Sequence, residues 1–181
     1  MVKSTMNKEF FNRIKKGSAH IEGAPFIVSD RHWGFSVVLD ANTRIHFIEG
    51  EPSAHLHKYR TEDYILQDGV MEVYRGIFYE GDLEKTIANL EVIKMSPGDR
   101  VVMPPNMVHI PVNVSPTGSI FAEISHGPYE EGDIERVYDK NARSLELAEK
   151  WSALGYKKGI SIVDLIVLIK NKKLRKKKKN I

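Results

Sequence analysis

The sequence predicts a mainly β fold, arranged as a sandwich or small barrel with short flanking helices. Between residues 26 and 126, short apolar runs alternate with polar residues at a period of two, which is typical of half-buried strands. Gly, Pro, Asn and Asp separate these runs and favour turns. No long helical pattern interrupts them, so a parallel, doubly wound sheet is not expected. Residues 1–181 are expected to form one domain, because this length suffices for a well-filled core.

Nine strands are expected in this β core, and a short helix should precede them. The helix is predicted over residues 7–16, where Asn7 can act as the N-cap. Many short strands at close spacing are typical of sandwiches and barrels. The predicted strands cover residues 35–39, 44–49, 53–57, 63–67, 70–75, 90–95, 100–103, 109–113 and 119–125.

Residues 141–173 are expected to form two C-terminal helices. The first is predicted over residues 141–154, because Gly155 follows at the position of a C-terminal cap. The second is predicted to begin after Ser161, which can cap it and has an acidic residue three positions later. A strand is the alternative for this second run, because many of its residues are β-branched.

The composition excludes several classes of site. The chain has no cysteine, so disulfides, thiolate catalysis and cysteine-ligated metal clusters are excluded. The longest apolar run, residues 162–169, is much shorter than the roughly 20 residues of a membrane helix. Residues 1–16 lack the apolar segment of a secretory signal. We therefore expect a cytoplasmic protein with no membrane partner.

The charge is distributed unevenly along the chain. Residues 170–181 contain eight Lys or Arg and no acid, so the net charge of +3 for the whole chain corresponds to −5 for the remainder. A basic tail, residues 174–181, could contact nucleic acid or an anionic membrane. No aromatic residues lie between the lysines to stack on bases. A solvated, disordered tail is therefore the expectation, and nucleic acid is not an expected partner.

Four residues of the metal-binding type lie in two clusters. His55 and His57 are spaced i, i+2, which places both imidazoles on the same face of a strand. Glu62 follows this pair closely, and His109 lies in a later predicted strand. Three neutral imidazoles and one carboxylate form a mixed nitrogen and oxygen site. Such a site suits a divalent transition metal and leaves room for a substrate.

Turn-forming residues flank both clusters at fixed spacings. The two stretches are Gly50-x4-His55-x-His57-x4-Glu62-x6-Gly69 and Gly98-x5-Pro104-x-Asn106-x2-His109-x3-Asn113. They resemble the two signature motifs of the cupin superfamily, whose members are small β-barrels of the jelly-roll type. Gly50 is one residue closer to the histidines than is usual, and Asn106 stands where Gly is usual, although Asn tolerates a left-handed backbone.

The cupin resemblance implies one bound metal ion. Its ligands would be His55, His57, Glu62 and His109. Mn²⁺ is the expected ion, and Co²⁺, Ni²⁺, Zn²⁺ and Fe²⁺ suit the same ligands, because affinity order alone does not choose among them.

The residues around these motifs resemble two families of sugar isomerases. The stretch His57-x4-Glu62-Asp63 and the segment 123–125 are similar to parts of D-lyxose isomerases. Those are cupins that interconvert D-lyxose with D-xylulose and D-mannose with D-fructose. Residues 132–139 resemble instead the closing segment of cupin-type mannose-6-phosphate isomerases. The resemblance covers residues 33–143 and implies ketol isomerisation of sugars with the C2 configuration of mannose.

This reaction assigns roles to further residues. A base must move a proton between C2 and C1, and a cation must polarise the carbonyl and stabilise the enediolate. Glu123 is the candidate base, because it alternates with the apolar residues of its strand and would point toward the metal. His46, Tyr59 and Arg136 are the candidate substrate-binding residues, and Trp33 is a candidate stacking wall. The alternative for His46 is a core histidine with its hydrogen bonds satisfied. The alternative for Arg136 is a surface salt bridge.

The motifs leave other functions open. A free sugar is preferred to mannose 6-phosphate, because the Arg and Lys residues of the predicted barrel are not grouped in sequence, although folding could group them. A cupin dioxygenase could use the same ligands, and a non-catalytic sugar-binding cupin is a third alternative. The expected partners are a small sugar and a second copy of the chain. A homodimer is expected because pairing of two sheets would bury the apolar runs.

Overall fold

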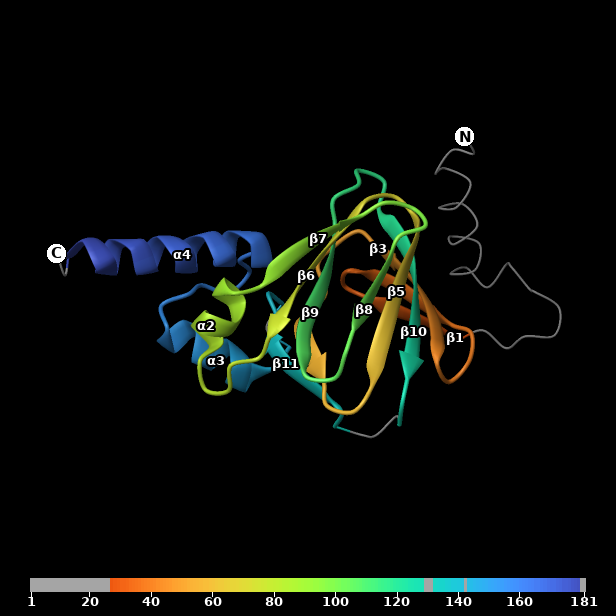
Figure 1. Cartoon of the computed structure of the whole chain (residues 1–181), viewed down its shortest axis with the longest axis horizontal. Helices are drawn as coiled ribbons and strands as arrows, with labels where there is room; N and C mark the ends of the chain where they lie inside the picture. Colours follow the sequence, from red (N-terminus) through yellow and green to blue (C-terminus); the bar gives the residue numbers. More distant parts are fainter. Residues whose placement is uncertain (1–26, 129–131, 142, 180–181) are drawn as a thin grey trace.

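In the part of the chain that the structure describes, two antiparallel sheets face each other and carry three helices at one side (Figure 1). This computed structural model describes residues 27–128, 132–141 and 143–179. The helix predicted over residues 7–16 lies outside the described residues. Within the described part of the chain, no helix has both the length and the apolar character needed to cross a membrane.

The strands of both sheets pair only in the antiparallel sense. Among the described residues, hydrogen bonds join them into two separate sheets and not into one closed ring. The first sheet has the order β1 (Ile27–Arg31), β2 (Gly34–Val38), β3 (Thr43–Ile48), β10 (Ser119–His126), β5 (Thr61–Asp68) and β8 (Arg100–Met103). The second has the order β11 (Ile134–Tyr138), β4 (Ala54–His57), β9 (Met107–Asn113), β6 (Met71–Ile77) and β7 (Glu91–Met95).

These sheets confirm the predicted mainly β fold and all nine predicted strands, with shifts of one or two residues at their ends. Two strands were not predicted, β1 and β11, and each is the edge of its sheet. Both are short and rich in charged or polar residues, so their sequences lack the apolar run of an internal strand. The short helix α2 (Leu83–Ala88) was also not predicted; Asp82 caps it by accepting a hydrogen bond from the backbone N–H of Lys85.

The space between the sheets is apolar at one end and polar at the other. Along β5, the inward side chains change from Glu62 through Tyr64 to Leu66. Tyr64 and Leu66 belong to a buried cluster with Val73 and Phe121, which contributes about 1.5–3 kcal/mol for each large apolar side chain. This cluster closes one end of the fold and leaves the other end for the polar groups.

The turns around the polar end depend on left-handed backbone. Asn106 has φ 63°, which confirms that Asn can replace the usual Gly of the motif at this position. Gly69 has φ 85°, and a Cβ atom there would lie 2.6 Å from the carbonyl oxygen of Gly118. Gly69 therefore allows the chain to turn from β5 into β6 against a neighbouring loop.

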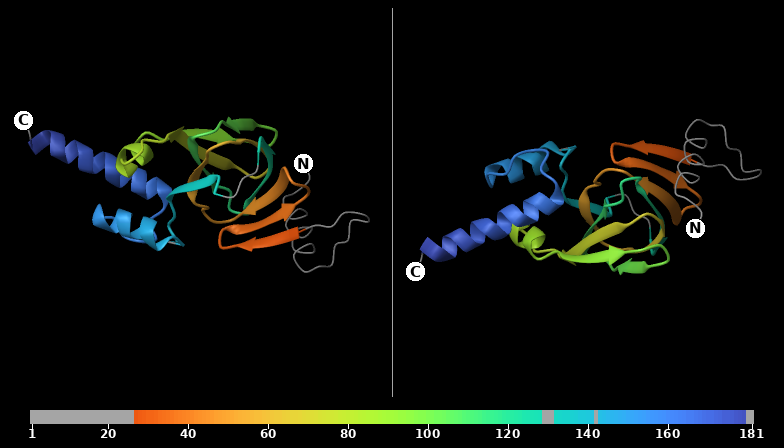
Figure 2. Two further views of the ribbon diagram at one scale, coloured as in Figure 1. Left: turned by 90° about the horizontal axis from the view of Figure 1, so that it is seen from below. Right: turned by 90° about the horizontal axis from the view of Figure 1, so that it is seen from above.

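The helices pack on the outer face of the second sheet, opposite to the side that carries β1 and β2 (Figure 2). Helix α3 (Leu145–Ala153) begins after Ser144 and not at residue 141, because Ser144 Oγ accepts the backbone N–H of Leu147. Gly155 follows it with φ 86°, as expected for a C-terminal cap.

The last element is a helix and not the alternative strand. Helix α4 (Ile162–Lys179) begins at the predicted cap, where Ser161 Oγ accepts the N–H of Asp164 and donates to its carboxylate. Ile162, Leu165 and Ile169 are fully buried in one stripe, which is the spacing of a helix face. The helix continues to Lys179, so the expected disordered tail is helical over its described part, because Lys and Arg are good helix formers.

Candidate metal centre

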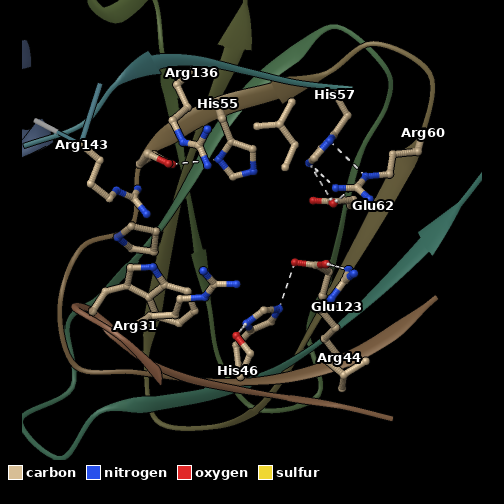
Figure 3. Close-up of a pocket in the computed structure, with 16 residues that line it drawn as sticks. Arg31, Arg44, His46, His55, His57, Arg60, Glu62, Glu123, Arg136 and Arg143 are labelled. Atoms are coloured by element: carbon tan, nitrogen blue, oxygen red, sulfur yellow. Dashed lines mark hydrogen bonds and ion pairs between the residues drawn. The ribbon is translucent and has the colours of Figure 1, made fainter. Parts of the chain in front are cut away.

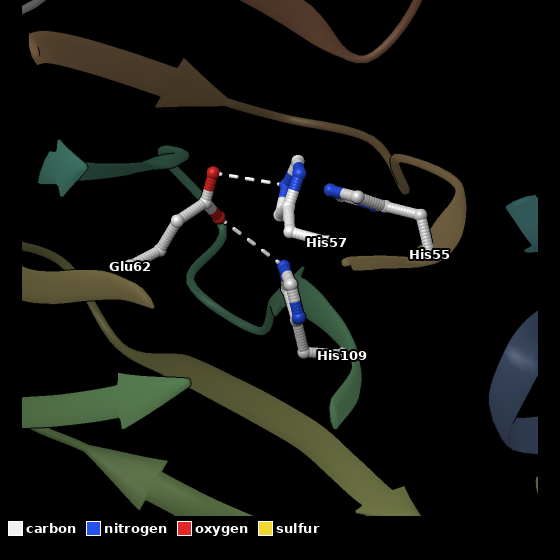
Figure 4. A group of neighbouring side chains, drawn as sticks. All are labelled: His55, His57, Glu62 and His109. Atoms are coloured by element: carbon white, nitrogen blue, oxygen red, sulfur yellow. Dashed lines mark ion pairs between the residues drawn. The ribbon is translucent and has the colours of Figure 1, made fainter. Parts of the chain in front are cut away.

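The four predicted metal ligands converge at the polar end (Figure 4). His55 and His57 project from the same face of β4, and His109 pairs directly with His55 across the β4–β9 ladder. Glu62 lies on β5 in the opposite sheet. One ligand atom from each residue lies within 4.8 Å of all the others. The cluster therefore joins the two sheets and could hold a metal ion.

Each histidine is oriented by a hydrogen bond at its Nδ1 atom. His55 Nδ1 lies 2.9 Å from the carbonyl oxygen of Ser53, and His109 Nδ1 lies 2.9 Å from that of Met107. His57 Nδ1 lies 2.9 Å from a carboxylate oxygen of Asp133. Because all three partners are acceptors, we assign the proton of each ring to Nδ1. The Nε2 atoms then face the centre, as in histidines that bind metals, and His57 Nε2 also lies 3.3 Å from Nη2 of Arg60.

The donor set fits a divalent cation. His57 Nε2 lies 2.9 Å from one oxygen of Glu62, and His109 Nε2 lies 3.3 Å from the other. His109 Nε2 is buried and has no hydrogen-bond partner among the described residues. The Nε2 atoms of His57 and His109 thus flank the two oxygens of Glu62, and a cation between them would contact all three residues. The separations match adjacent ligands at about 2.1 Å from one ion.

Burial sets the protonation of these groups. Burial, with a smaller effect of His109, lowers the pKa of His55 to about 3, so its imidazole is neutral at pH 7. Burial by itself would raise the pKa of Glu62, but the close imidazoles of His109 and His57 outweigh it and hold the pKa well below its usual range. A neutral imidazole and an ionised carboxylate are the forms that bind a metal.

Two buried charges that were not predicted support the cluster. Asp133 accepts the N–H groups of Lys58 and Tyr59 at 2.9 and 3.0 Å with the oxygen that does not contact His57. Arg60 Nε lies 3.2 Å from Asp133 and 3.3 Å from Glu62. It also lies 3.0 Å from His57 Nδ1. Since that nitrogen already has the Asp133 oxygen as its acceptor, we assign Arg60 to the two carboxylates, whose buried charge it balances.

The expectation that Tyr59 lines the site is not met. Its side chain is 53% exposed and lies outside the cavity. The prediction extended the alternation of a strand beyond His57. However, β4 ends at His57, and Asp133 holds the next backbone N–H groups in a turn that directs Tyr59 outward.

A cavity of about 210 Å³ adjoins the metal cluster, and Glu123 faces it (Figure 3). In the β10–β5 ladder, Glu123 pairs with Tyr64 and Ser125 pairs with Glu62. Paired residues lie on the same face of a sheet, so Glu123 and Glu62 are diagonal neighbours on the inner face. The structure therefore places the predicted base beside the predicted ligands.

Glu123 is held by two side chains from β3. Arg44 donates to one carboxylate oxygen at 3.0 Å, and His46 Nε2 lies 3.0 Å from the other. Burial and the charge of Glu62 both raise the pKa of Glu123, but His46 and Arg44 outweigh them and lower it. Glu123 is thus ionised at neutral pH and can accept a proton.

His46 lines the cavity, but its surroundings change its expected role. Its Nδ1 lies 2.8 Å from the hydroxyl of Ser36, and its Nε2 contacts Glu123. Both ring nitrogens already have protein partners, so His46 orients Glu123 and has no nitrogen left for a sugar hydroxyl. Trp33 lines the cavity beside His46, with ring centroids 5.7 Å apart.

Arg136 also lines the cavity, together with arginines that were not predicted. Arg136 and Asp133 lie in the segment 132–139, whose family resemblance was the only signal for them in the sequence. Arg31 and Arg143 come from β1 and from the loop before α3, and nothing in the local sequence marks them as site residues.

Comparisons with known proteins support the fold. No family model and no curated protein matches the sequence. Among solved structures, the capsular polysaccharide assembling protein CapF from Staphylococcus aureus is 12% identical, with a TM-score of 0.51 over 66% of this chain and 33% of that chain. A variant of Streptomyces PAC13 with uridine is 12% identical, with a TM-score of 0.50 over 66% of this chain and 93% of that one. PAC13 is a nucleoside dehydratase.

A weaker similarity, with a TM-score of 0.46 and 11% identity, is to the Drosophila melanogaster CENP-C cupin domain, over 68% of this chain and 99% of that one. The chain spans about a third of the length of the CapF chains that it matches. At these identities the similarities concern the fold alone. The two antiparallel sheets and this likeness give the chain the cupin fold, a double-stranded β-helix.

Proposed function

We propose that the protein is a metal-dependent isomerase that interconverts an aldose and its 2-ketose. The observation that carries this proposal is that an ionised carboxylate, Glu123, lines one small cavity together with three members of the four-residue cluster, His55, His57 and Glu62. Its volume of about 210 Å³ is below the roughly 300–1,000 Å³ of sites for drug-sized ligands and suits a small polar molecule.

The chain supplies a proton carrier beside the metal site. A divalent ion held by His55, His57, Glu62 and His109 would polarise the sugar carbonyl. Glu123 takes the proton from C2 and returns it to C1, while the hydroxyl proton of O2 passes to O1. No atom is gained or lost, because the aldose and the ketose are isomers. Arg44 and His46 keep the carboxylate directed into the cavity before and after the transfer.

The proposed sugars share the C2 configuration of mannose. This part of the proposal depends on the resemblance of residues 57–65 and 123–125 to D-lyxose isomerases. The substrate pairs are then D-lyxose with D-xylulose and D-mannose with D-fructose. Mn²⁺ is the proposed ion. A site of three imidazoles and one carboxylate also suits other divalent metals.

Replacing Glu123 by Gln tests the role of this carboxylate. Gln keeps the shape but cannot accept the C2 proton, so we expect ketose formation to fall by about 10²–10⁴-fold. Bound metal, measured by elemental analysis, should stay at the wild-type level because Glu123 is not a ligand. The assay incubates Mn²⁺-loaded protein with lyxose, mannose and mannose 6-phosphate and measures the ketose.

Glu146→Gln is the matched control, since Glu146 is an exposed residue of α3 that does not line the cavity. It should keep full turnover. Wild-type turnover in the Glu123→Gln variant would remove Glu123 from the mechanism. Absence of ketose from all three sugars in the wild-type protein, together with oxygen uptake, would replace the isomerase by a dioxygenase.

A further inference from the structure

The cavity contains a second group of charged side chains, which the proposed proton transfer does not use. Three arginines, Arg31, Arg136 and Arg143, line the cavity and are named here the arginine cluster. Figure 3 shows their guanidinium groups directed into the cavity, on the side away from Glu62 and Glu123. The cavity thus has a proton-transfer side and a cationic side.

The fold brings these arginines together from three separate segments. Arg136 lies on β11 and pairs directly with His55 of β4, so both side chains lie on the inner face of the sheet. Arg31 is the last residue of β1, the edge strand of the opposite sheet. Arg143 lies before α3, and its Nε is held 2.6 Å from the buried carboxylate of Asp139.

The positive charge of this cluster is only partly balanced by the protein. Within the described ranges 27–128, 132–141 and 143–179, Arg31 and Arg136 form no ion pair, while Arg143 has one carboxylate partner. Elsewhere in the cavity Arg44 is paired with Glu123. A metal ion at the four-residue cluster would add further positive charge. A neutral sugar would leave the guanidinium groups of Arg31 and Arg136 without a charged partner, whereas an anionic group would pair with them.

We propose that the substrate is an anionic sugar whose phosphate or carboxylate binds to Arg31, Arg136 and Arg143. This inference rests on the proposed isomerase reaction and replaces the free sugars named above by anionic sugars of the same C2 configuration. The carbonyl end of the sugar lies beside Glu123, and the anionic group lies at the opposite side of the cavity. Planar guanidinium groups bind both phosphate and carboxylate through paired, charge-assisted hydrogen bonds.

The double variant Arg31→Gln/Arg136→Gln tests the arginine cluster. The measured quantity is the ratio of kcat/KM for mannose 6-phosphate to kcat/KM for mannose. We expect a ratio above one in the wild-type chain and a fall of about 10–100-fold in the variant, because charge-assisted hydrogen bonds to the anion are lost. Arg175→Gln, an exposed arginine on α4, is the matched control and should keep the wild-type ratio.

Calorimetric titration of the full chain with mannose 6-phosphate, D-mannuronate and mannose gives a readout that does not need turnover. Tighter binding of either anion than of mannose, with loss in the double variant, supports the inference, and the tighter anion identifies phosphate or carboxylate. If the double variant does not fold, Arg136→Lys and Arg31→Gln are measured singly. Smaller losses in the same ratio are then expected.

The two proposals fail in different ways. Turnover of mannose and mannose 6-phosphate with equal kcat/KM would overturn the arginine cluster as an anion site and leave the isomerase intact. Arginine-dependent binding of an anionic sugar without any ketose would overturn the isomerase and leave the anion site intact. Equal binding of all three sugars by the wild-type chain and the double variant would overturn the anion site directly.

Discussion

Asp133 accepts a hydrogen bond from Nδ1 of His57, as backbone carbonyl groups do from Nδ1 of His55 and His109. Its carboxylate lies 2.9 Å from His57 Nδ1 and also accepts two backbone N–H groups of the turn after β4. One buried residue therefore orients a metal ligand and ends the strand that carries it. Such a partner fixes the tautomer of the imidazole and limits its rotation.

Asp133→Asn should weaken metal binding without removing a ligand. Loss of the carboxylate frees the orientation of His57, so we expect the Kd for Mn²⁺ to rise by about 10–100-fold. The Kd is measured by titration of metal-free protein. His109→Ala, which removes a ligand, should lower bound metal and activity together. A wild-type Kd in the Asp133→Asn variant would show that the carboxylate has no influence on the site.

At the scale of elements, the edge strands and the C-terminal helix explain why the site has its shape. The edge strands β1 and β11 belong to opposite sheets and bring Arg31 and Arg136 to the same side of one cavity. The first turns of helix α4 pack into the apolar cluster behind the sheet that holds the histidines, and Leu165 is fully buried there. The packing of this helix supports the strands β4 and β9 from behind.

Leu165→Ala should destabilise the whole domain. The substitution leaves a cavity under α4, and we expect the free energy of unfolding to fall by about 2–5 kcal/mol. Denaturant unfolding measures this change. Val167→Ala is the control on the same helix, because Val167 is 52% exposed, and its effect should stay within about 0.5 kcal/mol. Equal effects of the two variants would mean that α4 is not docked on the sheet.

At the scale of the whole molecule, the metal cluster is a link between the two sheets. The three histidines belong to the second sheet and Glu62 to the first. An ion bound by all four residues holds the sheets together in the native state only. Metal binding is therefore expected to stabilise the fold. The homodimer remains a prediction.

Removal of metal by EDTA should lower the melting temperature. An ion at 100 times its Kd stabilises the native state by about 2.7 kcal/mol, which corresponds to roughly 5–10 °C for a chain of this size. Calorimetry of Mn²⁺-loaded and EDTA-treated protein measures the shift, and added Mn²⁺ should restore it. His109→Ala should show a much smaller shift. An unchanged melting temperature on metal removal would contradict the proposed link between the sheets.

The sequence was sufficient for the mainly β class, for the internal strands and for the metal-ligand cluster. Alternation at a period of two marks any strand with one buried face, and the i, i+2 spacing of His55 and His57 follows from the same geometry. The caps Ser161 and Gly155 could also be predicted from the sequence, because each acts on the backbone of its own helix.

The rest of the site depends on contacts between residues far apart in the chain. The pairing of Asp133 with His57, the orientation of Glu123 by His46 and the grouping of three arginines arise from strand order and register, which no short segment encodes. Two of the four edge strands of the described sheets, β1 and β11, escaped prediction because their short sequences mix charged and apolar residues, which an edge position tolerates. Motif spacing and the cupin resemblance therefore identified the four candidate metal ligands. Packing of the two sheets selected the groups around them, because side chains from distant strands meet only when the sheets face each other.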